Sequence, residues 1–167
     1  MTPESIAELD EKYYPLERYG GSTGLAYSAA VTDGEFACPA DRMAIGLARS
    51  APVYAYEFND RTAPAPDPFR RVPFPVGASH GLELRYLFDI GGAPTLNPDQ
   101  RRLSDQMIDY WSQFVKTGTP DVPGEPQWPQ FSSDGKRLSL QTPEPSITTD
   151  YAARHQCPFW AALTGSR

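Results

Sequence analysis

The segment best suited to chemistry surrounds His80, in the run Gly77-Ala78-Ser79-His80-Gly81-Leu82-Glu83. Glycines on both sides of the histidine permit a tight turn that leaves the imidazole accessible. Histidine is the commonest general base, and catalytic residues are often mounted on loops that a rigid scaffold positions. The sequence therefore favours His80 as a general base, with a surface histidine in a turn as the alternative.

A nucleophile for this base is harder to find. Gly20-Gly21-Ser22-Thr23-Gly24 fits the G-x-S-x-G pattern of a nucleophile elbow. The elbow needs an apolar strand directly before the serine, but residues 9–19 are charged and interrupted by Pro15. An independent esterase that uses Ser22 is therefore the weakest of the enzymatic hypotheses.

The acidic residues offer no clear partner for His80. Glu83 follows the histidine by three residues and belongs to the short helix expected after it, while Asp33 and Glu35 lie far away in sequence. A triad acid must hold the second imidazole nitrogen, and spacing alone places none of these carboxylates there.

The other residues capable of metal or redox chemistry are His155, Cys38 and Cys157. His155 lies in an expected C-terminal helix, where a single histidine is more often structural. The cysteines are 119 residues apart, which is unlike any metal-site spacing, so they are either free buried thiols or one long-range disulfide. We expect no metal and no cofactor.

The elements that must position these residues are mostly helices joined by turns, as 18 prolines and 13 glycines indicate. The clearest helix begins at Asn97-Pro98-Asp99-Gln100, a capping sequence with proline in the first turn, and ends at Gly118. Its apolar positions, expected to pack into the core, are Leu103, Met107, Tyr110, Trp111, Phe114 and Val115. Helices are expected at 2–13, 25–31, 39–50, 81–88, 97–117 and 151–163, strands at 52–58 and 137–141, and an irregular proline-rich run at 63–75.

Composition narrows the class of protein. The chain has 167 residues, enough for one domain, and a net charge of −6 without a basic run, which argues against a nucleic-acid partner. No window is apolar enough to cross a bilayer, so we expect no membrane partner. The first five residues lack the basic and apolar runs of a signal peptide, which leaves a cytoplasmic or a secreted parent open.

Several short segments, in order, resemble the C-terminal part of the type B carboxylesterases, the cholinesterase-like branch of the α/β-hydrolases. The resemblance covers residues 13–163 and is specific because six pieces keep the family's order. They are Thr32-Asp33-Gly34-Glu35-Phe36-Ala37-Cys38-Pro39, the strand Pro52 to Phe58, Gly77 to Leu84 with Tyr86 and Phe88, Tyr110 to Pro120, Trp128-Pro129, and Cys157-Pro158-Phe159-Trp160.

The resemblance implies an α/β fold in which residues 1–167 form the C-terminal portion of an α/β-hydrolase, with only two or three strands of the parent sheet. It implies that His80 is the catalytic histidine of a serine carboxylesterase, and that Cys38 and Cys157 stand where some members form a disulfide. In the family, the nucleophilic serine, the triad acid and the oxyanion-hole loop lie upstream of the matched region, which here would be ahead of Met1.

The leading hypothesis is therefore a carboxylic ester hydrolase to which this chain supplies the triad histidine. Its partners would be a small-molecule ester and the N-terminal part of the hydrolase, and the chain alone would be inactive. The alternatives are a non-catalytic cholinesterase-like interaction domain and an inactive truncated gene product.

Overall fold

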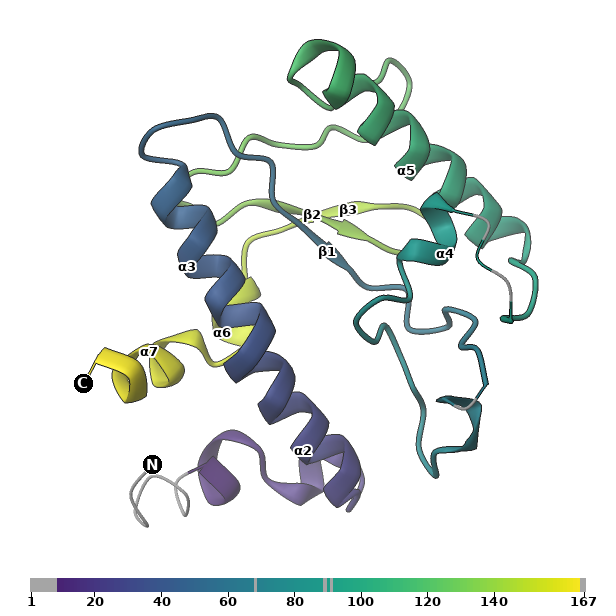
Figure 1. Ribbon diagram of the computed structural model, residues 1–167. Helices are drawn as coiled ribbons and strands as arrows, with labels where there is room; N and C mark the ends of the chain where they lie inside the picture. The colour runs from purple at the N-terminus through teal and green to yellow at the C-terminus, as the bar shows by residue number, and fades with distance from the viewer. Residues whose placement is uncertain (1–8, 68, 89, 91, 166–167) are drawn as a thin grey trace. The chain divides into compact units, whose positions relative to one another are not determined.

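The computed structural model describes residues 9–67, 69–88, 90 and 92–165 (Figure 1). The chain folds as two compact units. The first combines Met1–Ala51 with Asp150–Arg167, and the second is the continuous segment Pro52–Thr149. None of the helices in the described ranges is both long and apolar enough to cross a membrane.

The second unit is built on a three-stranded sheet in the order β1-β2-β3. β1 (Tyr56–Phe58) runs parallel to β2 (Arg137–Leu140), and β2 runs antiparallel to β3 (Ser146–Thr148). The two expected strands are confirmed in shortened form, whereas the sequence did not predict β3. The connection between the parallel strands contains α4 (Leu84–Leu87) and α5 (Pro98–Thr117), as parallel pairing requires.

The long helix α5 forms where the capping sequence predicts it. The Asn97 side chain accepts from the Gln100 amide at 2.9 Å, and the Gln100 side chain accepts from the Asn97 amide at 3.0 Å. Gly118 ends the helix with φ of +80°, a conformation that glycine adopts without steric cost. This reciprocal capping satisfies amides that the first turn would otherwise leave unpaired.

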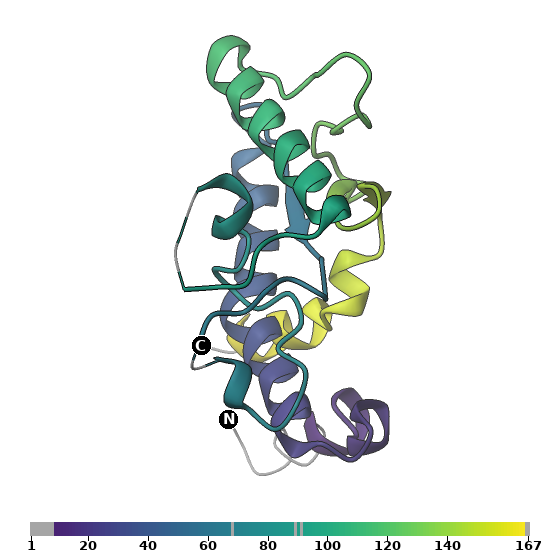
Figure 2. The same cartoon turned by 90° about the vertical axis from the view of Figure 1, so that its right-hand side faces the viewer.

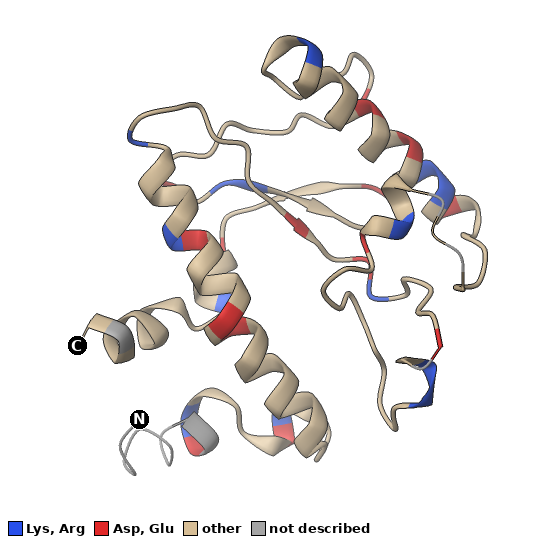
Figure 3. Cartoon of the chain, in the orientation of Figure 1, with Lys and Arg blue, Asp and Glu red and all other residues tan. Residues whose placement is uncertain are grey.

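The core of the second unit lies between α4, α5 and the sheet. Leu103, Met107 and Tyr110 of α5 are fully buried, together with Tyr86, Leu138 and Leu140. The apolar positions expected on this helix lie only partly in the core, because Val115 is 83% exposed and Phe114 is 46% exposed. Both acidic and basic residues lie along α5 (Figure 3).

The first unit is helical. α2 (Thr23–Val31), the π-helical segment η3 (Thr32–Ala37) and α3 (Cys38–Leu47) follow one another without interruption, after the short turns η1 (Leu9–Tyr13) and η2 (Leu16–Tyr19). Of the N-terminal helix expected at 2–13, residues 2–8 lie outside the described residues, and residues 9–13 form the π-helical segment η1. The two middle helices are confirmed, at 23–31 and 38–47.

The expected single helix at 151–163 is wrong. The structure has two short helices, α6 (Tyr151–Arg154) and α7 (Cys157–Gly165), as Figures 1 and 2 show. Gln156 between them has φ of +53°, which is incompatible with a continuous right-handed helix. The apolar periodicity of the sequence does not reveal this break.

Candidate functional site

His80 lies in an exposed turn directly ahead of α4. Gly77 and Gly81 on either side of it have φ of +63° and +89°, a region that glycine reaches without strain. The Ser79 hydroxyl donates to the Val76 carbonyl at 2.6 Å and closes the turn from its N-terminal side. The expected placement of His80 on a glycine-flanked turn is thus what the structure shows.

The turn continues into α4, which is held by the core. Leu82 is 8% exposed and Tyr86 is completely buried, so two side chains within six residues of His80 are fixed by packing. The Ser104 hydroxyl of α5 also donates to the Tyr86 carbonyl at 2.6 Å. The exposed histidine is therefore mounted on a rigid support.

A buried carboxylate, Asp60, anchors this support from the end of β1. Its Oδ2 accepts from the Tyr86 hydroxyl at 2.5 Å and from Gln100 Nε2 at 3.1 Å. Its Oδ1 accepts from the Thr62 amide at 2.9 Å, from the Thr62 hydroxyl at 2.7 Å and, more weakly, from the Thr142 hydroxyl at 3.4 Å. One side chain, 2% exposed, thus ties together β1, α4 and α5.

The electrostatics of this cluster keep Asp60 ionised and Tyr86 protonated. Burial by itself would raise the pKa of Asp60, but hydrogen bonds from Tyr86, Thr62 and Gln100 outweigh it and hold the pKa below the usual range. Burial, with the hydrogen bond to the Asp60 carboxylate, raises the pKa of Tyr86 well above its ordinary value. The cluster therefore keeps its donors and acceptors matched across neutral pH.

The anchoring roles of Asp60 and Tyr86 were not predicted from the sequence, although Tyr86 falls in the family-like segment around His80. Asp60 stands two residues beyond the strand expected at 52–58, where an acidic residue commonly marks a turn. The available signal was an acid at a strand end, followed by Thr62 in the spacing of a local Asx turn. Nothing in the sequence pairs this acid with Tyr86, because the contact spans 26 residues.

Ser22 serves as a helix cap. Its side chain accepts from the Leu25 amide at 3.3 Å at the start of α2, and the element before it is the 3₁₀ turn η2. Among residues 9–21 no strand precedes Ser22, in line with the charged, proline-interrupted sequence there. Ser22 belongs to the first unit, whereas His80 belongs to the second.

Of the acids considered beside His80, Asp33 has its partners in the first unit. Glu83 occupies the N-cap position of α4, where its side chain makes no capping hydrogen bond. Asp33, which is 5% exposed, accepts from the Tyr14 hydroxyl at 2.8 Å and lies 2.6 Å from His155 Nδ1. His155 therefore sits in a polar cluster of the first unit.

Cys38 and Cys157 form a disulfide with an S–S distance of 2.07 Å. The bond joins the first residue of α3 to the first residue of α7, and both cysteines are buried. It resolves the alternative that the sequence left open in favour of the pairing that the resemblance implies. Among the described residues, no three His, Cys, Asp or Glu side chains gather in a group that could hold a metal ion.

The helices and the three-stranded sheet form a partial α/β-hydrolase fold. A solved structure, Aspergillus niger EstA, matches 99% of this chain with a TM-score of 0.72 and 24% identity, which establishes the fold. The model of the carboxylesterase family matches residues 2–160. The chain belongs to the carboxylesterase family.

Curated relatives support this assignment. The chain is 32% identical over 155 residues to acylcarnitine hydrolase from Rattus norvegicus, covering 87% of this chain. It is 29% identical over 165 residues to cocaine esterase from Homo sapiens, covering 96% of this chain. The matches span only 27% and 28% of those relatives, and 33% of the EstA chain.

Proposed function

We propose that this chain supplies the catalytic histidine of a carboxylic ester hydrolase. The observation that supports the proposal is the position of His80, exposed on a glycine-flanked turn that Asp60, Ser104 and the core anchor, in a chain of the carboxylesterase family. The names of the relatives, an acylcarnitine hydrolase and a cocaine esterase, point to small carboxylic esters as the class of substrate.

In the proposed mechanism, the imidazole of His80 takes the proton of a serine hydroxyl as its oxygen attacks the ester carbonyl. The protonated imidazole then gives that proton to the departing alcohol, and an acyl-serine remains. A water molecule then attacks the acyl-serine while His80 takes a proton from it. The protonated imidazole returns that proton to the serine oxygen, and the carboxylic acid is released. We assign the serine, the triad acid and the oxyanion hole to polypeptide outside this chain, since Ser22 caps a helix.

The test uses the complete hydrolase, in which this chain is present together with the polypeptide that supplies the serine. His80→Ala should lower kcat for p-nitrophenyl acetate by about 10⁴-fold or more, because a triad acts as a unit. The matched control is His155→Ala, since the chain contains two histidines. His155→Ala should lower the stability but leave kcat of the folded enzyme within about threefold of the unaltered enzyme.

The outcome also separates the proposal from its main alternative. Equal hydrolysis by the His80→Ala variant and the unaltered hydrolase would assign the chain to a non-catalytic role, such as an interaction domain. A large loss of kcat in His155→Ala, with no loss in His80→Ala, would indicate that the general base is His155 of the first unit.

A further inference from the structure

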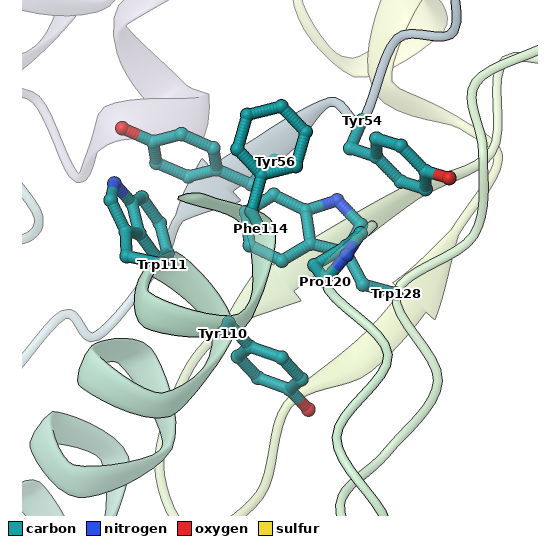
Figure 4. A pocket seen from close by; sticks show the side chains of 7 residues that line it. All are labelled: Tyr54, Tyr56, Tyr110, Trp111, Phe114, Pro120 and Trp128. Carbon is teal, nitrogen blue, oxygen red and sulfur yellow. The ribbon is translucent and has the colours of Figure 1, made fainter. Parts of the chain in front are cut away.

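Two cavities of the second unit differ in the chemistry of their walls. One, of about 160 Å³, is lined by residues of β1, α5 and the segment after α5, chiefly the rings of Tyr54, Tyr56, Trp111, Phe114 and Trp128 (Figure 4). None of the described residues that line it is charged. The other cavity, of about 370 Å³, lies at α4 and α5 and has two arginines in its wall. Small-molecule sites usually have volumes of roughly 300–1,000 Å³, so the larger cavity is the better candidate for a ligand.

Much of the wall of this larger cavity is apolar. It is lined by Leu87 and Phe88 at the end of α4, by Leu96 ahead of α5, and by Ile108 within α5. Phe88 is 60% exposed and Ile108 is 42% exposed, so both leave hydrocarbon in contact with water. Covering this hydrocarbon would remove it from water, which favours a ligand with an alkyl chain.

The polar groups of the cavity are led by the guanidinium groups of Arg85 on α4 and Arg101 on α5. Arg85 Nη1 donates to the Ile90 carbonyl, and Arg101 Nη1 donates to the Leu96 carbonyl. Both contacts tie a guanidinium to the segment between the two helices. Because a guanidinium has five N–H donors, the carbonyl contact of Arg101 holds the group in place and leaves it donors for an anion.

The surroundings of these arginines favour an anion. Within the described part of the chain, no carboxylate lines the cavity. Asp99, two residues before Arg101, accepts from Arg102 at 3.2 Å, and the Ser104 hydroxyl in the cavity wall donates to the Tyr86 carbonyl at 2.6 Å. The planar guanidinium of arginine can donate two parallel hydrogen bonds to a carboxylate, which makes carboxylate its best-matched small anion.

We propose that this cavity binds a carboxylate with an unbranched alkyl chain, that is, the anion of a medium-chain fatty acid. Its carboxylate accepts from Arg101 beside the positive charge of Arg85, and its alkyl chain covers Phe88, Leu96 and Ile108. The site uses none of the residues assigned to ester hydrolysis. The proposal therefore stands or falls separately from the proposed function.

The carboxylate contact is tested with octanoate and 1-octanol, which differ in charge, by NMR titration of the folded chain. Arg101→Met removes the charge and keeps a flexible apolar side chain. It should weaken octanoate binding by about fivefold or more and leave 1-octanol binding within about twofold. The matched control is Arg102→Met, the neighbouring residue on α5, which is not among the residues that line the cavity. This control should change the octanoate affinity by less than about twofold.

The alkyl contact is tested by chain length and by a second pair of variants. From butanoate to octanoate, the affinity should rise about twofold to fourfold with each added CH₂ group, as expected for a partly to fully covered methylene. Ile108→Ser should lower the octanoate affinity by about threefold or more. Its control is Val115→Ser, because Val115 is an exposed apolar residue of the same helix that is not among the lining residues.

The unaltered chain gives a further readout that needs no variant to fold. Octanoate should shift the backbone amide signals of Leu96, Ser104 and Ile108 in a saturable way. The absence of saturable shifts would overturn the proposal. Shifts centred on Tyr54 and Trp111 would also overturn it, because they would place the ligand in the aromatic cavity.

The variants supply two more outcomes that would overturn the proposal. Equal losses of octanoate affinity in Arg101→Met and Arg102→Met would mean that surface charge in general attracts the anion. An affinity that does not depend on chain length would mean that the alkyl chain is not bound.

Discussion

Replacing Asp60 by asparagine tests the anchor beneath the His80 turn. Asparagine keeps the shape of the side chain but offers one oxygen and one NH₂ group in place of two acceptors. The Thr62 amide faces Oδ1 and Gln100 Nε2 faces Oδ2, and both are hydrogen-bond donors. The Gln100 amide group cannot readily turn over, because its oxygen accepts from the Asn97 amide. Whichever way the asparagine side chain is turned, its NH₂ group therefore faces another donor, either the Thr62 amide or Gln100 Nε2.

The expected cost follows from these contacts. A hydrogen bond to a charged group contributes about 1.5–3 kcal/mol, and leaving one buried donor without an acceptor costs about 1–3 kcal/mol. With some relaxation of the cluster, we expect Asp60→Asn to lower the free energy of unfolding by about 2–5 kcal/mol. Thr142→Val is the matched control, because it removes only the 3.4 Å contact to the same carboxylate and should cost under about 0.5 kcal/mol.

The assay is urea unfolding at pH 7, followed through the indole NMR signals of Trp111 and Trp128, both of which report on the second unit. The depressed pKa of Asp60 means that its stabilisation is present above the usual aspartate value of 3.8 and is lost as the pH falls through the lower folded value. The difference between the unaltered chain and Asp60→Asn should therefore shrink below about pH 4. Equal stability of the two at pH 7 would refute the anchoring role of Asp60.

Three further predictions concern single features. Replacing both Cys38 and Cys157 by serine should lower the free energy of unfolding by about 4–5 kcal/mol in the chain-entropy model, measured by urea unfolding without reductant; a change below about 1 kcal/mol would contradict it. Gly34→Ala should cost about 1–3 kcal/mol, because the added Cβ would lie 2.8 Å from the Trp160 ring, and an unchanged melting temperature would argue against this contact. Burial raises the pKa of Tyr110 to about 12, so stability present below pH 10 should fall as the pH rises toward 12, and Tyr110→Phe should flatten that fall in urea midpoints measured across this range.

The parts of the fold that the sequence predicted well are those set by local chemistry. Asn97 and Gln100 form the reciprocal cap, and Gly118 ends the helix in the left-handed conformation, because each depends only on neighbouring residues. The glycines around His80 likewise adopt the positive φ values that make the turn. The position of the candidate histidine could thus be read from the sequence.

The features that the sequence left hidden depend on distant contacts or on isolated backbone strain. β3 has only three residues and exists because β2 pairs with it. The Asp60–Tyr86 anchor joins residues that no local pattern connects. The break at Gln156 requires a non-glycine residue at positive φ, which periodicity does not indicate. The exposure of Val115 reflects which side of α5 meets the sheet, a tertiary property.

The most direct test of the central claim is the intact mass of the folded chain after exposure to a fluorophosphonate serine probe. The account assigns the nucleophile to polypeptide outside this chain and makes Ser22 a helix cap, so it predicts no mass gain for the isolated chain. It also predicts labelling of the serine-bearing polypeptide in the complete hydrolase, abolished by His80→Ala. A stoichiometric gain on the isolated chain, removed by Ser22→Ala, would show that the chain activates its own serine and would contradict the account.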